Sequence, residues 1–165
     1  MGNYLNPGNE NFQKIVNSEI YVDKTGMIRY TNSVVNTMQG YICVSRPRRF
    51  GKSTAASMLT AYYSRECDSR ELFSGLNIVE SADFLKYLNR YNTIFLNMQE
   101  FISQSENVRE MIALIRKSVL WELLEEYPEY RFFDKTNLTR TMQDVYSKSK
   151  IPYVVIIDEW DCVFR

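Results

Sequence analysis

Hydrophobic residues occur in two patterns along this chain: short continuous runs, and longer stretches in which they recur at helical spacing. The continuous runs cover residues 41–44, 93–98 and 153–157. Runs of this length are typical of strands that are buried on both faces of a parallel sheet. The helical stretches lie between these runs, so strands and helices alternate. This alternation predicts an α/β fold with a mainly parallel sheet that is covered by helices on both faces.

The predicted helices differ in the length of their patterns. The longest pattern covers residues 108–127 and ends before Pro128, because proline cannot continue a helix. Shorter patterns predict helices at residues 25–38, 53–65, 81–88 and 137–148. Residues 1–40 are largely polar and contain several turn-forming residues. We therefore expect one structural domain, in which residues 1–40 form an N-terminal lead-in and residues 41–165 form the core.

Composition and charge exclude several classes of function. The chain has 165 residues, 45% of them hydrophobic, which suffices for the core of one domain. Its 20 basic and 20 acidic residues give no net charge, so overall charge favours neither nucleic acid nor anionic membranes. The sequence has neither a run long enough for a transmembrane helix nor a signal-peptide pattern. We expect a cytoplasmic protein with no membrane partner and no direct nucleic-acid binding by this segment.

Histidine is absent, and the three cysteines, Cys43, Cys67 and Cys162, show no paired spacing. The absence of histidine excludes catalysis by a serine or cysteine with a histidine base, and it excludes histidine-bearing metal sites within this chain. The cysteine spacing indicates neither a disulfide framework nor a zinc site. Catalytic chemistry must therefore come from carboxylates, lysine, arginine, hydroxyl groups and the backbone.

One segment has the pattern of a phosphate-binding loop. Residues 45–53 read Ser-Arg-Pro-Arg-Arg-Phe-Gly-Lys-Ser, and they connect the first predicted strand to a predicted helix. The usual pattern is glycine, four variable residues, and then Gly-Lys-Ser or Gly-Lys-Thr. This chain keeps Gly51, Lys52 and Ser53, but Arg46 stands where the first glycine belongs. In such a loop the backbone N–H groups and the lysine bind phosphates, and the hydroxyl ligates magnesium.

Several side chains of this segment are candidates for nucleotide contacts. Pro47 removes one N–H group from the loop, so phosphate binding must rest on the amides that follow it. The arginines of the loop either form an exposed basic surface or add positive charge beside the phosphates. The candidate nucleotide-binding residues are Arg48, Arg49, Phe50, Gly51, Lys52, Ser53 and Thr54.

A second motif follows the last predicted strand. The apolar residues 154–157 precede Asp158 and Glu159, which is the Walker B pattern of nucleotide-hydrolysing proteins. Asp158 can hold magnesium together with Ser53, and Glu159 can orient and deprotonate an attacking water. The two motifs together predict ATP and Mg²⁺ as cofactors. The alternative is that the first motif is a helix start and the second a solvated strand end.

Three phrases together resemble the bacterial AAA-ATPase-like family of predicted ATP-binding proteins. They are Tyr-Val-Asp-Lys-Thr at residues 21–25, the loop at 45–53, and Ile-Ile-Asp-Glu-Trp-Asp at 156–161. The resemblance extends over nearly the whole chain. It implies a three-layer αβα P-loop NTPase fold, and it makes Arg46 a family trait, because Arg-Pro-Arg-Arg-Phe-Gly-Lys-Ser/Thr is the usual loop of this family.

The resemblance also implies roles for individual residues. It assigns Lys52 and Ser53 to phosphate and magnesium, Asp158 to the Walker B acid and Glu159 to the catalytic base. The lead-in phrase occupies the place where related ATPases contact adenine. Tyr21 and Asp23 are therefore candidates for a base pocket, with packing as the equal alternative.

The resemblance further implies elements that would follow Walker B in sequence. Related ATPases insert a strand between the Walker A and Walker B strands, and this strand, a polar sensor and an arginine come later in the chain. This sequence stops at Arg165, so we expect the N-terminal part of a longer protein, with a fold that is incomplete at the C-terminal end. Members of the family often carry a PD-(D/E)XK nuclease-like domain downstream, and exposed sheet edges would favour homo-oligomers.

The sequence therefore leads to an ordered set of functional hypotheses. The first is a magnesium-dependent ATPase module that switches a larger protein. The second is a nucleotide-binding or protein-interaction module without turnover. A small-molecule kinase is a third hypothesis, but the acidic pair Asp158-Glu159 favours water as the phosphate acceptor.

Overall fold

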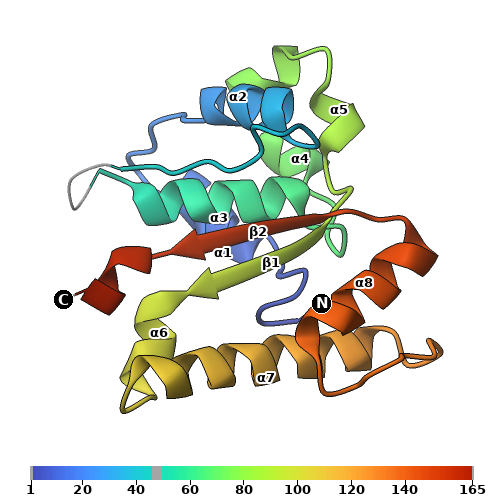
Figure 1. The fold of residues 1–165 in the computed structure, drawn as a ribbon. Coiled ribbons are helices and arrows are strands. Elements are labelled where there is room, and N and C mark those ends of the chain that lie inside the picture. The colour runs from blue at the N-terminus through green and yellow to red at the C-terminus, as the bar shows by residue number, and fades with distance from the viewer. Residues whose placement is uncertain (1, 46–49, 165) are drawn as a thin grey trace.

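A computed structural model of the chain describes residues 2–45 and 50–164, and its centre is a parallel sheet of two strands (Figure 1). Strand β1 (Asn92–Asn97) pairs with β2 (Tyr153–Asp158), and the last residues of the two strands, Asn97 and Asp158, are direct neighbours. Both strands were predicted from their apolar runs, and both are confirmed. Their parallel pairing, with helices between them in sequence, confirms the α/β class.

The helices agree with the sequence patterns where those patterns are long. The predictions for 25–38, 53–65, 108–127 and 137–148 are confirmed with slightly different bounds, whereas 81–88 forms only one helical turn. No helix of the described residues is both long enough and apolar enough to cross a membrane. The helices are α1 (Glu10–Val16), α2 (Gly26–Val34), α3 (Lys52–Tyr63), α4 (Arg70–Phe73), α5 (Phe84–Tyr87), α6 (Met98–Ser103), α7 (Val108–Glu126) and α8 (Leu138–Ser149), with 3-10 helices η1 (Asn77–Glu80) and η2 (Trp160–Phe164).

Three helices of this chain begin with an asparagine cap. Asn97, Asn107 and Asn137 precede α6, α7 and α8, and each accepts a backbone N–H with its side chain. Such a cap satisfies one of the amides that the first helical turn leaves unpaired. Helix α3 is preceded instead by Gly51, which adopts a left-handed conformation with φ of 75°. Glycine has no side chain that could cap the helix, so this start differs chemically from the other three.

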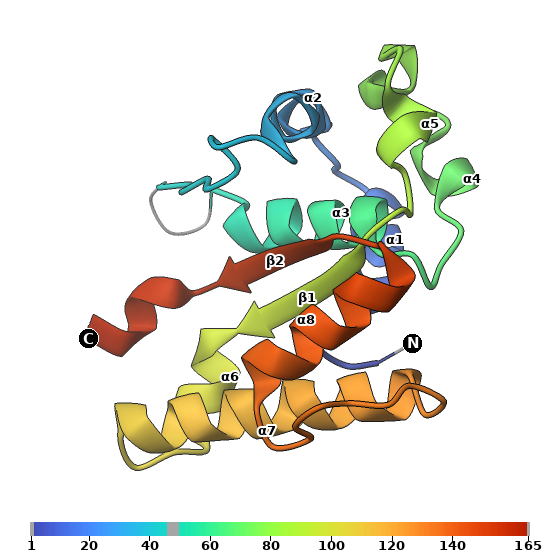
Figure 2. The ribbon, with the colours of Figure 1, turned by 45° about the vertical axis from the view of Figure 1, so that its right-hand side comes forward.

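The two hydrophobic cores lie on opposite faces of the sheet (Figure 1 and Figure 2). One core contains the buried side chains of α1, α2 and α3, and Val154 of β2 packs against it. The other contains Ile94 and Leu96 of β1 together with side chains of α6, α7 and α8, and Tyr153 of β2 packs against it. Because side chains alternate along a strand, these contacts fix which face each residue of β1 and β2 occupies.

The N-terminal segment extends the sheet at the free edge of β1. Leu5 forms an antiparallel bridge with Ile94, and the backbone N–H of Phe95 donates to the carbonyl of Tyr4 at 2.8 Å. Leu5 is 2% exposed and belongs to the core beneath α7. The segment therefore covers the edge of β1, and it protects backbone groups that would otherwise invite pairing with another chain.

The prediction of a buried strand at residues 41–44 is wrong for the structure described here. Residues 41–45 have no regular secondary structure and are exposed, and Tyr41 is 99% exposed. A parallel strand needs hydrogen bonds from a neighbouring strand. Within the described residues β2 pairs only with β1, and Val155 and Ile157 of β2 remain about half exposed. Residues 41–44 thus have the sequence pattern of a strand, but within the described residues they have no neighbouring strand.

Candidate phosphate and metal site

The turn at Gly51 creates a helix start that suits an anion. The first helical hydrogen bond of α3 runs from the N–H of Ala55 to the carbonyl of Gly51 at 3.0 Å. The N–H groups of the first turn precede this bond, so helix geometry gives them no acceptor within α3. The first turn contains no acidic side chain. The first turn of α3 therefore supplies no carboxylate to the positive end of the helix dipole.

Asp158 lies at the end of β2, on the face that α3 covers, and Glu159 follows it. Val154 packs into the core of α3, and alternation along the strand places Asp158 on the same face. Asp158 is 9% exposed, and its Oδ1 accepts the backbone N–H of Glu159 at 3.0 Å. Glu159 has a left-handed backbone with φ of 52°, which is uncommon for a residue other than glycine.

The two predicted motifs lie at the same end of the molecule. Figure 1 and Figure 2 both show the N-terminal end of α3 and the C-terminal end of β2 on the same side. This follows from the topology, since α3 packs on β2 and runs with its start toward the strand's end. The Gly51 turn and the Asp158-Glu159 pair are therefore brought to one end of the sheet, where α/β proteins commonly bind ligands.

The other predicted loop residues have different surroundings. Arg48 and Arg49 lie outside the described residues. Phe50 is 63% exposed, Ser53 is also exposed, and Thr54 is half-buried. Ser53 is thus an exposed residue in the first turn of α3, which is compatible with its predicted contact with magnesium.

The expected magnesium site has few protein ligands. Among the described residues there is no group of three or more acidic or cysteine side chains that could hold a metal ion. Magnesium usually keeps several waters and binds through one or two carboxylates together with substrate phosphates. A donor set of Ser53 and Asp158 fits a magnesium ion that arrives with a nucleotide. It does not fit a site that would hold the ion without phosphates.

The base-pocket candidate Asp23 bonds to the protein backbone. Its Oδ1 accepts the N–H of Thr25 at 2.7 Å, and its Oδ2 accepts the N–H of Asn77 at 2.8 Å. Partial burial alone would raise the pKa of Asp23, but these bonds and the charge of Arg29 lower it below its usual value. Asp23 therefore ties the start of α2 to η1. Its contact with adenine stays a prediction.

The second candidate, Tyr21, packs within the core of α1 and α3. Its ring lies edge-on to Phe12, with 6.1 Å between the ring centroids. Burial, followed by the nearby carboxylate of Asp23, raises the pKa of the Tyr21 hydroxyl. Packing accounts for the described contacts of Tyr21, and its role in base binding likewise stays a prediction.

Comparison with known proteins adds one decisive finding. The model of the AAA-ATPase-like family, described as predicted AAA-ATPase, matches residues 7–164. This chain belongs to the AAA-ATPase-like family. The match includes the lead-in phrase, the loop and the acidic pair, so it confirms the resemblance seen in the sequence. Neither a curated protein nor a solved structure matches the chain.

Sequence reasoning missed one residue that this AAA-ATPase-like chain brings to the loop. Nζ of Lys24 donates a hydrogen bond to the backbone carbonyl of Phe50 at 2.9 Å. A Cβ atom at Gly51 would collide with the same Nζ. No spacing rule links Lys24 to the loop. The only available signal was its place inside the family phrase at residues 21–25.

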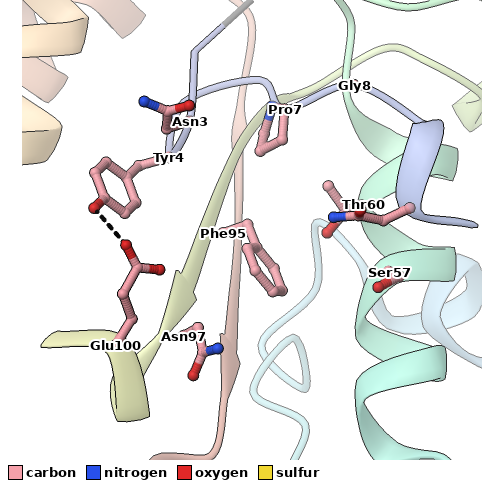
Figure 3. Close-up of a pocket in the computed structure, with 10 residues that line it drawn as sticks. Asn3, Tyr4, Pro7, Gly8, Ser57, Thr60, Phe95, Asn97 and Glu100 are labelled. Carbon is pink, nitrogen blue, oxygen red and sulfur yellow. Dashed lines mark hydrogen bonds between the residues drawn. The ribbon is translucent and has the colours of Figure 1, made fainter. Parts of the chain in front are cut away.

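A cavity of about 430 Å³ lies beside the predicted site, since Asn97, the neighbour of Asp158 in the sheet, is one of its lining residues (Figure 3). It opens between the N-terminal segment, α3, β1 and α6, and on one wall the hydroxyl of Tyr4 donates to Oε1 of Glu100 at 3.2 Å. None of the residues predicted to bind nucleotide or metal lines it. Its lining residues are Asn3, Tyr4, Pro7, Gly8, Asn11, Ser57, Thr60, Phe95, Asn97 and Glu100.

Proposed function

We propose that this chain is a P-loop ATPase module with a three-layer αβα fold, which binds ATP with magnesium and hydrolyses it. The observation that carries the proposal is the left-handed Gly51 at the start of α3, at the same end of the sheet as Asp158. The family match supports it, because it covers both motifs and describes a predicted AAA-ATPase.

The loop residues bind the phosphates in this proposal. The amides that begin α3 donate hydrogen bonds to phosphate oxygens, and the helix dipole favours the negative charge. Lys52 contributes a compact cation to the terminal phosphates. Gly51 is needed at the turn because its φ of 75° costs a residue with a side chain about 1–2 kcal/mol.

The acidic pair and Ser53 carry out the remaining steps. Ser53 and Asp158 would hold magnesium, which supplies positive charge against the phosphates during hydrolysis. Glu159 orients a water molecule toward the terminal phosphate and accepts its proton. The left-handed backbone of Glu159 supports this role, because residues held in sparsely populated conformations cluster at functional sites.

The open edge of β2 bears on the architecture of the proposed domain. We propose that a strand following Asp158 in sequence pairs with this edge and lies between β2 and residues 41–44, as the resemblance implies. This strand would cover Val155 and Ile157, which are about half exposed. It would also give residues 41–44 the neighbour that a parallel strand requires.

The proposal is tested by the variant Glu159→Gln. Glutamine keeps the size of the side chain but cannot accept the proton, so ATP binding should persist while phosphate release falls by about 100-fold or more. Binding is measured by calorimetry and turnover by phosphate release, with Lys52→Ala as the binding-deficient control. Unchanged turnover in Glu159→Gln would remove the assigned base.

Phosphate release by the unsubstituted chain separates the two leading functions. If saturating ATP with magnesium stabilises the chain against unfolding but releases no phosphate, the chain is a nucleotide-binding module without turnover. Ligand at about 100 times its dissociation constant should add about 2.7 kcal/mol to the free energy of unfolding. Stabilisation smaller than the measurement error at all ligand concentrations would contradict nucleotide binding itself.

A further inference from the structure

Lys24 contacts the predicted phosphate loop from a distant part of the sequence. Its Nζ donates to the carbonyl of Phe50 at 2.9 Å, and this carbonyl is its only hydrogen-bond acceptor among the described residues. The side chain is otherwise exposed. An ammonium group has three N–H donors, so the contact with Phe50 does not use its full capacity.

The backbone on both sides of Lys24 is held in place. On one side, Asp23 accepts the N–H of Asn77 at 2.8 Å. On the other, Thr25 is fully buried and its Oγ1 accepts the N–H of Ile78 at 3.1 Å. Both anchors attach to η1. The segment therefore presents the Lys24 side chain to the loop from a fixed position.

The ammonium group of Lys24 lies at the start of α3, a position that stabilises an anion but not a cation. It occupies the space beside Gly51 that a Cβ atom would fill, directly at the turn that begins α3. The start of a helix carries partial positive charge, so a cation placed there is repelled. The first turn of α3 has no acidic side chain to offset this repulsion. An anion that lies between these two positive groups would relieve their repulsion.

We propose that Lys24 is a second phosphate-binding lysine of this site, which pairs with the terminal phosphates of a bound nucleoside triphosphate. This inference rests on the proposed nucleotide-binding function. When the nucleotide binds, the ammonium group exchanges the neutral carbonyl of Phe50 for charged phosphate oxygens. Hydrogen bonds to charged acceptors are shorter and stronger than bonds to neutral ones. Lys24 thereby makes affinity depend on the number of phosphates.

The test compares ATP with AMP in the full chain. Lys24→Met removes the ammonium group and keeps an unbranched stem that is one atom shorter, so the dissociation constant for ATP with magnesium should rise about tenfold. The constant for AMP should change less than twofold, because AMP lacks the terminal phosphates. Both constants are measured by calorimetry. Lys24→Arg keeps the charge and should retain most of the affinity for ATP.

Two controls distinguish this inference from its alternatives. Lys117→Met removes an exposed lysine from α7 on the other face of the sheet, and it should leave both constants unchanged. If Lys24 only supports the loop, Lys24→Met will weaken ATP and AMP by the same factor and will lower the midpoint of thermal unfolding without ligand. Either that result or unchanged ATP binding would overturn the inference.

The failure of the inference differs from the failure of the proposed function. If the unsubstituted chain binds ATP and Lys52→Ala weakens this binding, the site exists, and the result for Lys24→Met decides the role of Lys24 alone. If the unsubstituted chain binds neither ATP nor ADP, the proposed function and the inference fall together.

Discussion

Replacing Glu122 with alanine should release the N-terminal segment from the edge of β1. Glu122 lies on α7 and is 7% exposed, yet its carboxylate accepts three backbone N–H groups. The donors are Asn3 at 2.9 Å, Tyr4 at 2.9 Å and Leu5 at 2.6 Å. One buried side chain thus holds three consecutive residues against the sheet.

The expected loss of stability follows from the burial of each bond. A hydrogen bond to a charged group contributes about 1.5–3 kcal/mol, and a buried donor that loses its acceptor bears the full cost of desolvation. Only the bond from Leu5 is fully buried, while those from Asn3 and Tyr4 are partly open to water. We therefore count the Leu5 bond in full and the other two at a fraction. Glu122→Ala should lower the free energy of unfolding by about 3 kcal/mol.

Thermal and urea unfolding, followed by circular dichroism, measure this loss. For a chain of this length, 1 kcal/mol shifts the thermal midpoint by about 2–4 °C, so the midpoint should fall by about 6–12 °C. Glu122→Gln keeps an acceptor oxygen and should show roughly half the effect. Glu125→Ala is the matched control, because Glu125 is exposed on the same helix. A loss in Glu122→Ala no larger than in Glu125→Ala would refute the reasoning.

Two further predictions concern the surroundings of the loop. Gly51→Ala should lower the free energy of unfolding by about 1–2 kcal/mol through its left-handed φ of 75°. The ammonium group of Lys24 is the end of a flexible side chain and can move aside, so urea unfolding should show about the same loss when Lys24→Met is also present, and a much smaller loss there would contradict this. Asp23→Asn should destabilise the chain at pH 6 but not in strong acid. The folded-state pKa of Asp23 is lowered, so its stabilising contribution is present above the unfolded value of about 3.9 and is lost as pH falls through the folded value. Thermal midpoints of the two proteins should converge below about pH 3, and a difference that is independent of pH would contradict the bonds from Thr25 and Asn77.

Sequence patterns predicted the helices and strands whose formation depends mainly on their own residues. Strands β1 and β2 and the long helix α7 have patterns that local periodicity determines. Residues 41–44 have an equally apolar run, but a parallel strand forms only with a neighbour, and neighbours are a property of the whole sheet. The short helix α6 escaped prediction because its six residues are too few to establish a helical period.

The contacts that cross long stretches of sequence could not be predicted in the same way. In the sequence, Glu122 is one of several charged residues of a predicted helix. Nothing in its local sequence indicates that its side chain accepts N–H groups from residues 3–5. The pairing of Leu5 with Ile94 likewise cannot be predicted from the spacing of hydrophobic residues. Both contacts arise when α7 and β1 pack together, and this packing depends on the complete fold.

The candidate site shows the same division between local and distant information. Gly51 was identified because a tight phosphate loop needs glycine at that turn, which is a rule about the loop itself. The structure adds that the ammonium group of Lys24 lies in the space beside Gly51 that a Cβ atom would enter. The backbone turn and the position of Lys24 are therefore best considered together, and we propose phosphates as the ligand that both would bind.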